Sequence, residues 1–169
     1  MTESTAPVEE RVELGALSPS IDPDDAPTRE FRVVCIRPGR ANRLIYDEEV
    51  LRQATPLFEG VTCFVDHQHG NDTHRSVRDV AGVIRDVAWQ MGVGITGRLR
   101  LASGQEWLGK LLARIVRDKA AGLPVPDVGL SADLIVVRRG NRVARIQRVN
   151  SVDVVFRPAA GGSFERILN

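Results

Sequence analysis

Strand-like segments that follow one another directly along the chain are the feature that most restricts its fold. Val, Ile, Leu, Phe and Thr crowd into short runs separated by Gly, Pro and Asn, which is the composition of β-strands and turns. Because helices do not alternate with these runs, the pattern favours antiparallel strands over a parallel βαβ sheet. The expected class is α+β, mainly β, a small antiparallel β-barrel or sheet flanked by helices. The predicted strands cover 31–37, 61–65, 77–89, 93–101, 128–137, 143–149 and 151–156.

One long helix interrupts the strands. Ser103 and Glu106 have the spacing of a capping box, in which each residue satisfies an unpaired backbone N–H of the other. Apolar side chains then recur at helical spacing over 107–116, and Gly122 followed by Pro124 ends the pattern. The sequence therefore predicts a helix that packs one apolar face against the sheet.

The first 29 residues differ in composition from the rest. They are rich in Pro, Ser, Thr, Asp and Glu and show no sustained periodicity, so residues 1–29 are interpreted as a flexible acidic arm and 30–169 as the folded domain. The chain of 169 residues is long enough for one domain with a core.

Net charge and hydropathy give no sign of a nucleic-acid or membrane partner. Lys and Arg number 23 and Asp and Glu 22, which gives a formal net charge of +1. No apolar run approaches the roughly 20 residues that a membrane-spanning helix needs. The two cysteines, Cys35 and Cys63, lie in apolar strand-like runs, which indicates buried free thiols in a reducing compartment.

Three polar residues stand out because each lies on or at the end of a strand. Ser131 is in an apolar strand that has no packing need for a hydroxyl, and His67 is placed where a strand passes into a polar loop. Asp153 is surrounded by valines, so its carboxylate should be paired or at a sheet edge. A serine, a histidine and an acid are the parts of an acyl-transfer site. The alternatives are a serine bonded to backbone, a surface histidine and a solvent-facing carboxylate.

The loop 66–76 also allows a metal site. It contains all three histidines, His67, His69 and His74, beside Asp66. Imidazoles and carboxylates are zinc ligands. Against this interpretation, all the ligands would come from one short loop, and no second cluster completes the shell. We therefore expect neither a metal nor a cofactor.

Several short motifs occur in an order that resembles the prohead proteases of tailed phages, serine proteases that share a fold with the herpesvirus assemblins. The similarity covers roughly residues 31–164. The matching segments are F-x-G at 58–60, D-H at 66–67, G-x-I at 82–84, G-L-S at 129–131 and S-x-D-x-V with P-A at 151–155 and 158–159.

The resemblance implies a role for each candidate residue. Ser131 would be the nucleophile, His67 the general base and Asp153 the third member of the triad. The loop with Gly161 and Gly162 would supply backbone N–H groups to the oxyanion, since glycines let the backbone approach a ligand closely. The alternative for this loop is an ordinary tight turn.

The resemblance also implies a setting. The domain 30–169 would be a protease that cleaves scaffold protein and major capsid protein inside the immature capsid, in the host bacterial cytoplasm. A homodimer is one expected form, and neither nucleic acid nor membrane is an expected partner. The alternatives are a non-catalytic capsid assembly or scaffold-binding module on the same fold, a metal-dependent hydrolase that uses His67, His69 and His74, and a β-rich binding domain without chemistry.

Overall fold

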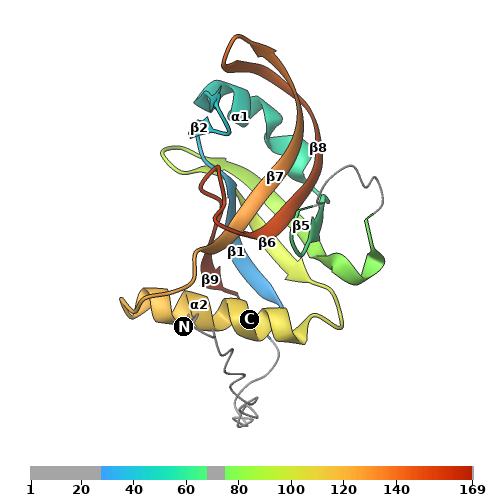
Figure 1. The fold of residues 1–169 in the computed structure, drawn as a ribbon, viewed down its shortest axis with the longest axis vertical. Helices are drawn as coiled ribbons and strands as arrows, with labels where there is room; N and C mark the ends of the chain where they lie inside the picture. The colour runs from blue at the N-terminus through green and yellow to red at the C-terminus, as the bar shows by residue number, and fades with distance from the viewer. Residues whose placement is uncertain (1–27, 68–74, 169) are drawn as a thin grey trace, which may run out of the picture.

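Two β-sheets make up most of the computed structural model, which describes residues 28–67 and 75–168 (Figure 1). The first sheet has five antiparallel strands in the order β4-β5-β6-β1-β9. The second has four strands in the order β2-β3-β8-β7, antiparallel except for one parallel pair between β3 and β8. The first-sheet strands are β1 (Glu30–Ile36), β4 (Thr62–Phe64), β5 (Val80–Gln90), β6 (Gly94–Leu101) and β9 (Ser163–Ile167). The second-sheet strands are β2 (Gly39–Ala41), β3 (Leu44–Tyr46), β7 (Val128–Arg139) and β8 (Arg142–Phe156).

The two sheets touch at two seams without merging into a closed barrel. At one seam Val65 bridges Val154, and at the other the Leu130 N–H donates to the Gly162 carbonyl at 3.2 Å. The bridge at Val65 is isolated, and the described residues form two separate sheets, so neither sheet continues into the other. The class α+β, mainly β, is confirmed, but within the described residues the strands form two sheets and not the closed barrel that was one expectation.

Helices cover the ends of the sheets. Helix α1 (Glu48–Ala54) continues into a 3-10 helix (Thr55–Phe58), a second 3-10 helix (Val77–Asp79) precedes β5, and α2 (Glu106–Ala120) lies across one end of the molecule (Figure 1). Buried leucines of α2 join the core with Phe31, whose ring meets that of Phe164 edge to face. None of the helices in the described residues is both long and apolar enough to span a membrane.

The start of α2 differs from the prediction. The helix begins at Glu106 and not at Ser103. Gly104 has a φ of +93°, which is outside the helical region, so the helix cannot extend back through it. The Glu106 carboxylate accepts a hydrogen bond from the Gly104 N–H at 3.2 Å, which satisfies a backbone donor of this turn without the predicted serine cap.

Strand β8 is one strand where two were predicted. Asp133 pairs with Ser151 and Leu134 with Val149, so Asn150 is an extra residue opposite this pair and forms a bulge. The pairing continues on both sides of Asn150, and together with β7 it makes the long hairpin at the top of Figure 1. Strands β2, β3 and β9, each three to five residues long, were not predicted.

Candidate active site

The register of the β7–β8 hairpin places Ser131 beside Asp153. These residues are direct partners across the antiparallel pair, so their side chains are on the same face of the sheet. Asp153 is completely buried and Ser131 is 7% exposed. The predicted alternation of β8 is confirmed, since Ser151 and Asp153 both contact the same arginine. A serine hydroxyl and a carboxylate are thus neighbours in a largely water-excluded place.

A left-handed turn after β4 brings His67 to this carboxylate. Asp66 has a φ of +61°, and its N–H donates to the Val154 carbonyl at 2.8 Å, which ties the chain to β8. His67 Nδ1 then lies 2.8 Å from Asp153 Oδ2, while its ring remains 40% exposed. With the proton on Nδ1, the ring donates to Asp153 and its Nε2 is an acceptor, which is the tautomer a general base requires.

Arg75 is the main contributor that the sequence interpretation missed. Its Nη2 donates to Asp153 Oδ2 at 2.6 Å and to Ser151 Oγ at 3.1 Å, and its Nη1 donates to the Asp66 carbonyl at 3.1 Å. The guanidinium also stacks over the Phe64 ring at 4.3 Å. The sequence pattern of β8 could have indicated such a residue. Ser151 and Asp153 are two residues apart on one face of an apolar strand, and a carboxylate buried there needs a hydrogen-bond donor.

The charge of Asp153 is held by its partners. Burial alone would raise the pKa of this carboxyl, but hydrogen bonds from His67, Arg75 and Ser151 outweigh burial and lower its pKa. The second oxygen, Oδ1, is buried and has no hydrogen-bond partner among the described residues. An unsatisfied buried acceptor costs about 1–3 kcal/mol of stability. The bonds to Oδ2 therefore favour the ionised carboxylate in the folded state, while the unpartnered Oδ1 reduces the stability gained.

The glycine loop after β8 packs against the strand that carries Ser131. The Leu130 N–H, one residue before Ser131, bonds to the Gly162 carbonyl. A Cβ on Gly162 would lie 2.1 Å from the Leu130 carbonyl oxygen, so only glycine permits this approach. Within the described residues neither Gly161 nor Gly162 donates its N–H to a backbone carbonyl.

Arg37 holds this loop from the other side. Its backbone N–H donates to the Ala160 carbonyl at 3.0 Å, and its Nε donates to the Gly161 carbonyl at 3.0 Å. Its Nη2 reaches Ser163 Oγ at 3.3 Å and Glu165 at 3.2 Å. The loop is therefore anchored through its carbonyls, which leaves its N–H groups available. Sequence reasoning gave no role to Arg37.

The structure brings together some of the predicted residues and leaves others apart. His67 and Asp153 are in contact, and Ser131 is beside Asp153, but in the described chain the Ser131 hydroxyl makes no side-chain hydrogen bond. His69 and His74 lie outside the described residues, so the metal interpretation of this loop is not tested.

The two cysteines are buried and free, as predicted. Burial raises the pKa of the Cys35 thiol to about 12. Burial, followed by the nearby Asp153 charge, also raises the pKa of Cys63. Because the thiolate is the nucleophilic form, neither cysteine is suited to attack a substrate.

Similarity to known proteins is found among solved structures. No family model matches the sequence, and no curated protein matches it. Among solved structures, the chain is similar to the capsid assembly protease gp21 of bacteriophage T4, with 19% identity and a TM-score of 0.44 over 75% of this chain and 81% of that one.

Replacing Asp153 with Asn tests the buried carboxylate. Because its pKa is lowered by folding, the carboxylate stabilises the fold above its unfolded pKa, and this contribution is lost as pH falls through the lowered folded value. We expect Asp153→Asn to lower the free energy of unfolding at pH 7 by about 1–3 kcal/mol, and the difference to vanish at acid pH. Urea unfolding at several pH values measures it. Asp133→Asn, on the facing strand, is the control, and an equal pH dependence in wild type and Asp153→Asn would contradict the assignment.

A second variant removes the arginine. Arg75→Gln should destabilise the protein by about 2–3 kcal/mol, because Asp153 would stay buried with one charged donor fewer. Arg75→Lys should recover only part of this, since an ammonium cannot reproduce the fork that reaches Asp153, Ser151 and Asp66. Urea unfolding at pH 7 provides the comparison, with the exposed Arg78→Gln as control. A stability loss no larger than that of the control would show that Arg75 holds nothing in place.

The glycine loop allows a matched pair of substitutions. Gly162→Ala should cost about 2 kcal/mol or more, because its Cβ would meet the backbone of Leu130 and Cys35. Gly161→Ala should cost about 1 kcal/mol, since its φ is +66° but its Cβ would meet only the flexible Arg37 side chain. Thermal unfolding compares them, and the reverse order of stabilities would contradict the described packing.

Proposed function

We propose that this chain is a serine endopeptidase of the prohead maturation type, with Ser131, His67 and Asp153 as its catalytic residues. The observation that carries the proposal is the bond between His67 Nδ1 and Asp153 Oδ2, 2.8 Å long, beside the cross-strand partner Ser131. A carboxylate bound to Nδ1 orients the ring and stabilises the imidazolium that forms when Nε2 takes a proton. The ordered sequence motifs that resemble prohead proteases support the same roles.

In the proposed reaction, His67 Nε2 takes the Ser131 proton as Oγ attacks the carbonyl carbon of a peptide bond. The tetrahedral intermediate collapses, the amine leaves with the proton from His67, and an acyl-enzyme remains. Water, activated by the same histidine, then releases the acid and restores Ser131. The N–H groups of Gly161 and Gly162 are the proposed oxyanion donors, each of which would be worth about 3–4 kcal/mol in the transition state.

The proposed substrates follow from the sequence resemblance. They are segments of scaffold protein and major capsid protein, cleaved inside the immature capsid in the host bacterial cytoplasm. A fold relation to the herpesvirus assemblins and a homodimeric form belong to the same proposal. No metal or cofactor has a role in it.

A pool of synthetic peptides of mixed sequence, analysed by mass spectrometry after incubation with the full chain, tests the activity. We expect internal peptide bonds to be cleaved at the same rate with and without EDTA. Loss of cleavage in EDTA would instead favour the hydrolase that uses His67, His69 and His74. Absence of cleavage, also with scaffold and capsid protein present, would contradict the protease.

A non-catalytic assembly module on the same fold is the second candidate. The observation that favours it is that Arg75 binds the same Asp153 oxygen as His67, so the cluster could serve only to anchor the loop to β8. In that case Arg75→Gln and His67→Ala would change stability alone. The peptide assay separates the two candidates, because a module cleaves nothing.

A further inference from the structure

Four arginines form a row across the outer face of the five-stranded sheet. Arg85 of β5 pairs with Arg98 of β6, Arg98 pairs with Arg32 of β1, and Arg32 pairs with Arg166 of β9. Direct partners share one face of a sheet, and adjacent strands are about 4.8 Å apart, so the row is about 15 Å long. We call these four residues the arginine row.

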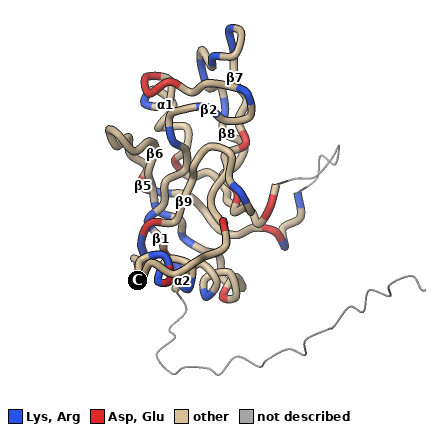
Figure 2. The backbone as a smooth tube through the Cα atoms, turned by 60° about the vertical axis from the view of Figure 1, so that its left-hand side comes forward, with Lys and Arg blue, Asp and Glu red and all other residues tan. Residues whose placement is uncertain are grey.

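The row faces away from the core. On β5, β6 and β1 the residue on one side of the arginine is buried, as Ile84, Leu99 and Phe31 show with 0% exposure. Basic positions gather around the β1 label in Figure 2, among acidic ones. Like charges directly opposite each other destabilise a sheet. Four arginines side by side therefore repel one another unless negatively charged groups lie close to them.

Described residues supply little of that charge. Arg98 is 3.4 Å from Asp86, with both side chains at least half exposed, and Arg32 reaches only the Thr96 hydroxyl, at 3.5 Å. Arg85 and Arg166 make no ion pair with any described residue. Arginines elsewhere do have close carboxylates, at 2.7 Å in Arg114–Asp118 and Arg142–Asp47.

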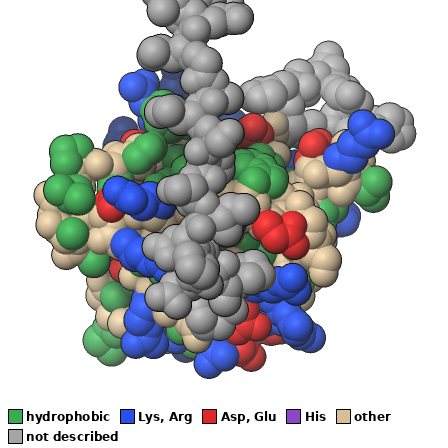
Figure 3. Space-filling model, turned by 90° about the horizontal axis from the view of Figure 1, so that it is seen from below, with side chains coloured by type: hydrophobic (Ala, Val, Ile, Leu, Met, Phe, Trp, Pro, Cys, Tyr) green, Lys and Arg blue, Asp and Glu red, His purple; other side chains and the backbone are tan. Residues whose placement is uncertain are grey.

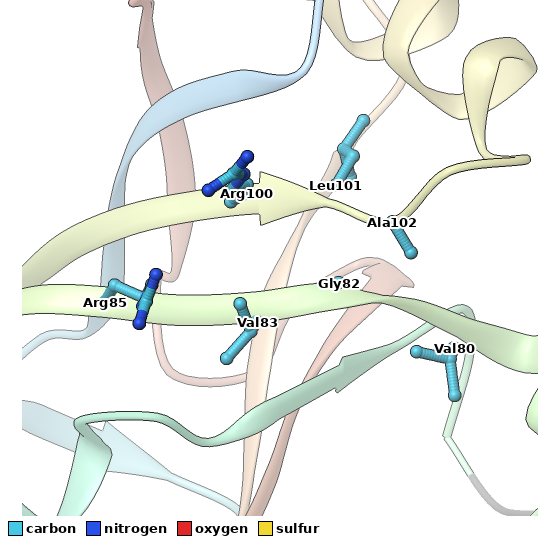
Figure 4. Close-up of a pocket in the computed structure, with 7 residues that line it drawn as sticks. All are labelled: Val80, Gly82, Val83, Arg85, Arg100, Leu101 and Ala102. Carbon is cyan, nitrogen blue, oxygen red and sulfur yellow. The ribbon is translucent and has the colours of Figure 1, made fainter.

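The same face is hollowed beside the row. A cavity of about 400 Å³ is lined by Val80, Val83, Arg85 and Arg100 among others, and Figure 4 shows Arg85 and Val80 at its two ends with Arg100 and Val83 between them. A second hollow of about 210 Å³ is lined by Arg85, Arg98 and Arg100 together with Glu30, Glu59 and Asp86. The surface therefore offers apolar space next to Arg85, which makes no ion pair with any described residue.

Charge is divided unevenly along this chain. Residues 1–27 hold seven acidic side chains and one arginine, so the other residues hold 15 acidic and 22 basic ones. On the end of the molecule shown in Figure 3, basic side chains are spread over the surface. The acidic segment leads into β1 next to the row, because β1 begins at Glu30, two residues before Arg32. Asp22, Asp24 and Asp25 are five to eight residues before Glu30, which is at most about 29 Å of extended chain.

We propose that the acidic segment 9–25 of this chain docks on the arginine row, in cis. The tether makes the contact intramolecular, with an effective concentration in the millimolar range. Several carboxylates then lie within reach of the row, in which Arg85 and Arg166 make no ion pair with any described residue. The contact is electrostatic and exposed, so salt weakens it.

Paramagnetic broadening in the full chain tests the proposal. A nitroxide is attached to Ser18→Cys, and Cys35 and Cys63 are both 0% exposed, so the label reacts at position 18. At 50 mM NaCl we expect backbone amide signals near the arginine row to lose at least half their intensity. The signals should recover in 0.5 M NaCl. They should also recover in the variant Arg85→Gln, Arg98→Gln, Arg166→Gln.

A second basic surface gives the matched control. The β7–β8 hairpin carries Arg138, Arg145 and Arg148, all exposed, and replacing these three with Gln should leave the broadening at the row unchanged. Broadening at the hairpin, or equally over the whole surface, would overturn the proposal. In a sample that mixes nitroxide-labelled and unlabelled chains, broadening of the signals of the unlabelled chains would also overturn the proposal. It would show that the segment of one copy contacts the row of another. If the row variant fails to fold, the salt titration and the single Arg166→Gln variant decide.

Discussion

The Ser131→Ala variant is expected to lose peptide cleavage by at least about 10³-fold while remaining folded. The hydroxyl makes no side-chain hydrogen bond in the described chain, and Ser131 is 7% exposed, so alanine removes one oxygen and leaves the packing in place. We expect the free energy of unfolding to change by less than about 1 kcal/mol.

Rates of peptide cleavage and urea unfolding, measured on the same preparations, separate chemistry from stability. Ser103→Ala, an exposed serine before α2, is the control and should cleave at the wild-type rate. Cleavage by Ser131→Ala at a rate within tenfold of wild type would remove this serine as the nucleophile.

His67→Ala should lose cleavage to a similar extent, about 10³-fold or more. Without the imidazole the groups that remain at the site are poor bases for the Ser131 proton, because the pKa of the Asp153 carboxyl is lowered and Arg75 is only a donor. The stability loss should be about 1 kcal/mol, since the ring is 40% exposed and one hydrogen bond to Asp153 is lost.

The same loop supplies the comparison for this variant. His69→Ala and His74→Ala should retain cleavage, which progress curves on one peptide substrate will measure. Partial recovery of the His67→Ala rate with added imidazole would support a role as base. Loss of cleavage in His69→Ala or His74→Ala, with His67→Ala active, would assign the base to another histidine.

Local pattern was sufficient to predict the strands that carry the site. Apolar runs gave β1, β5, β6, β7 and the two parts of β8, and alternation put Ser151 and Asp153 on one face. The bulge at Asn150 could not be foreseen, because it depends on pairing with the facing strand. The predicted start of α2 was wrong, because the conformation of Gly104, and not the capping motif, determines where the helix begins.

The contacts within the site depend on long-range geometry. Nothing in the residues around His67 indicates that Asp66 is left-handed and bonded to Val154, yet this turn aims the imidazole at Asp153. Arg75 lies in the same loop, and two of its three acceptors, on Ser151 and Asp153, come from the distant strand β8. The net charge of +1 likewise gave no indication that acidic side chains in residues 1–27 offset an excess of basic ones in the rest of the chain. A sum over the chain says nothing about which strands bring arginines together.

The central claim is that His67 and Asp153 activate Ser131, and labelling with a fluorophosphonate probe tests it most directly. Intact mass after treatment should show one adduct on the wild-type chain, and neither Ser131→Ala nor His67→Ala should acquire it. A folded wild-type chain that gains no adduct, even with scaffold and capsid protein present, or an adduct that persists in Ser131→Ala, would contradict the claim.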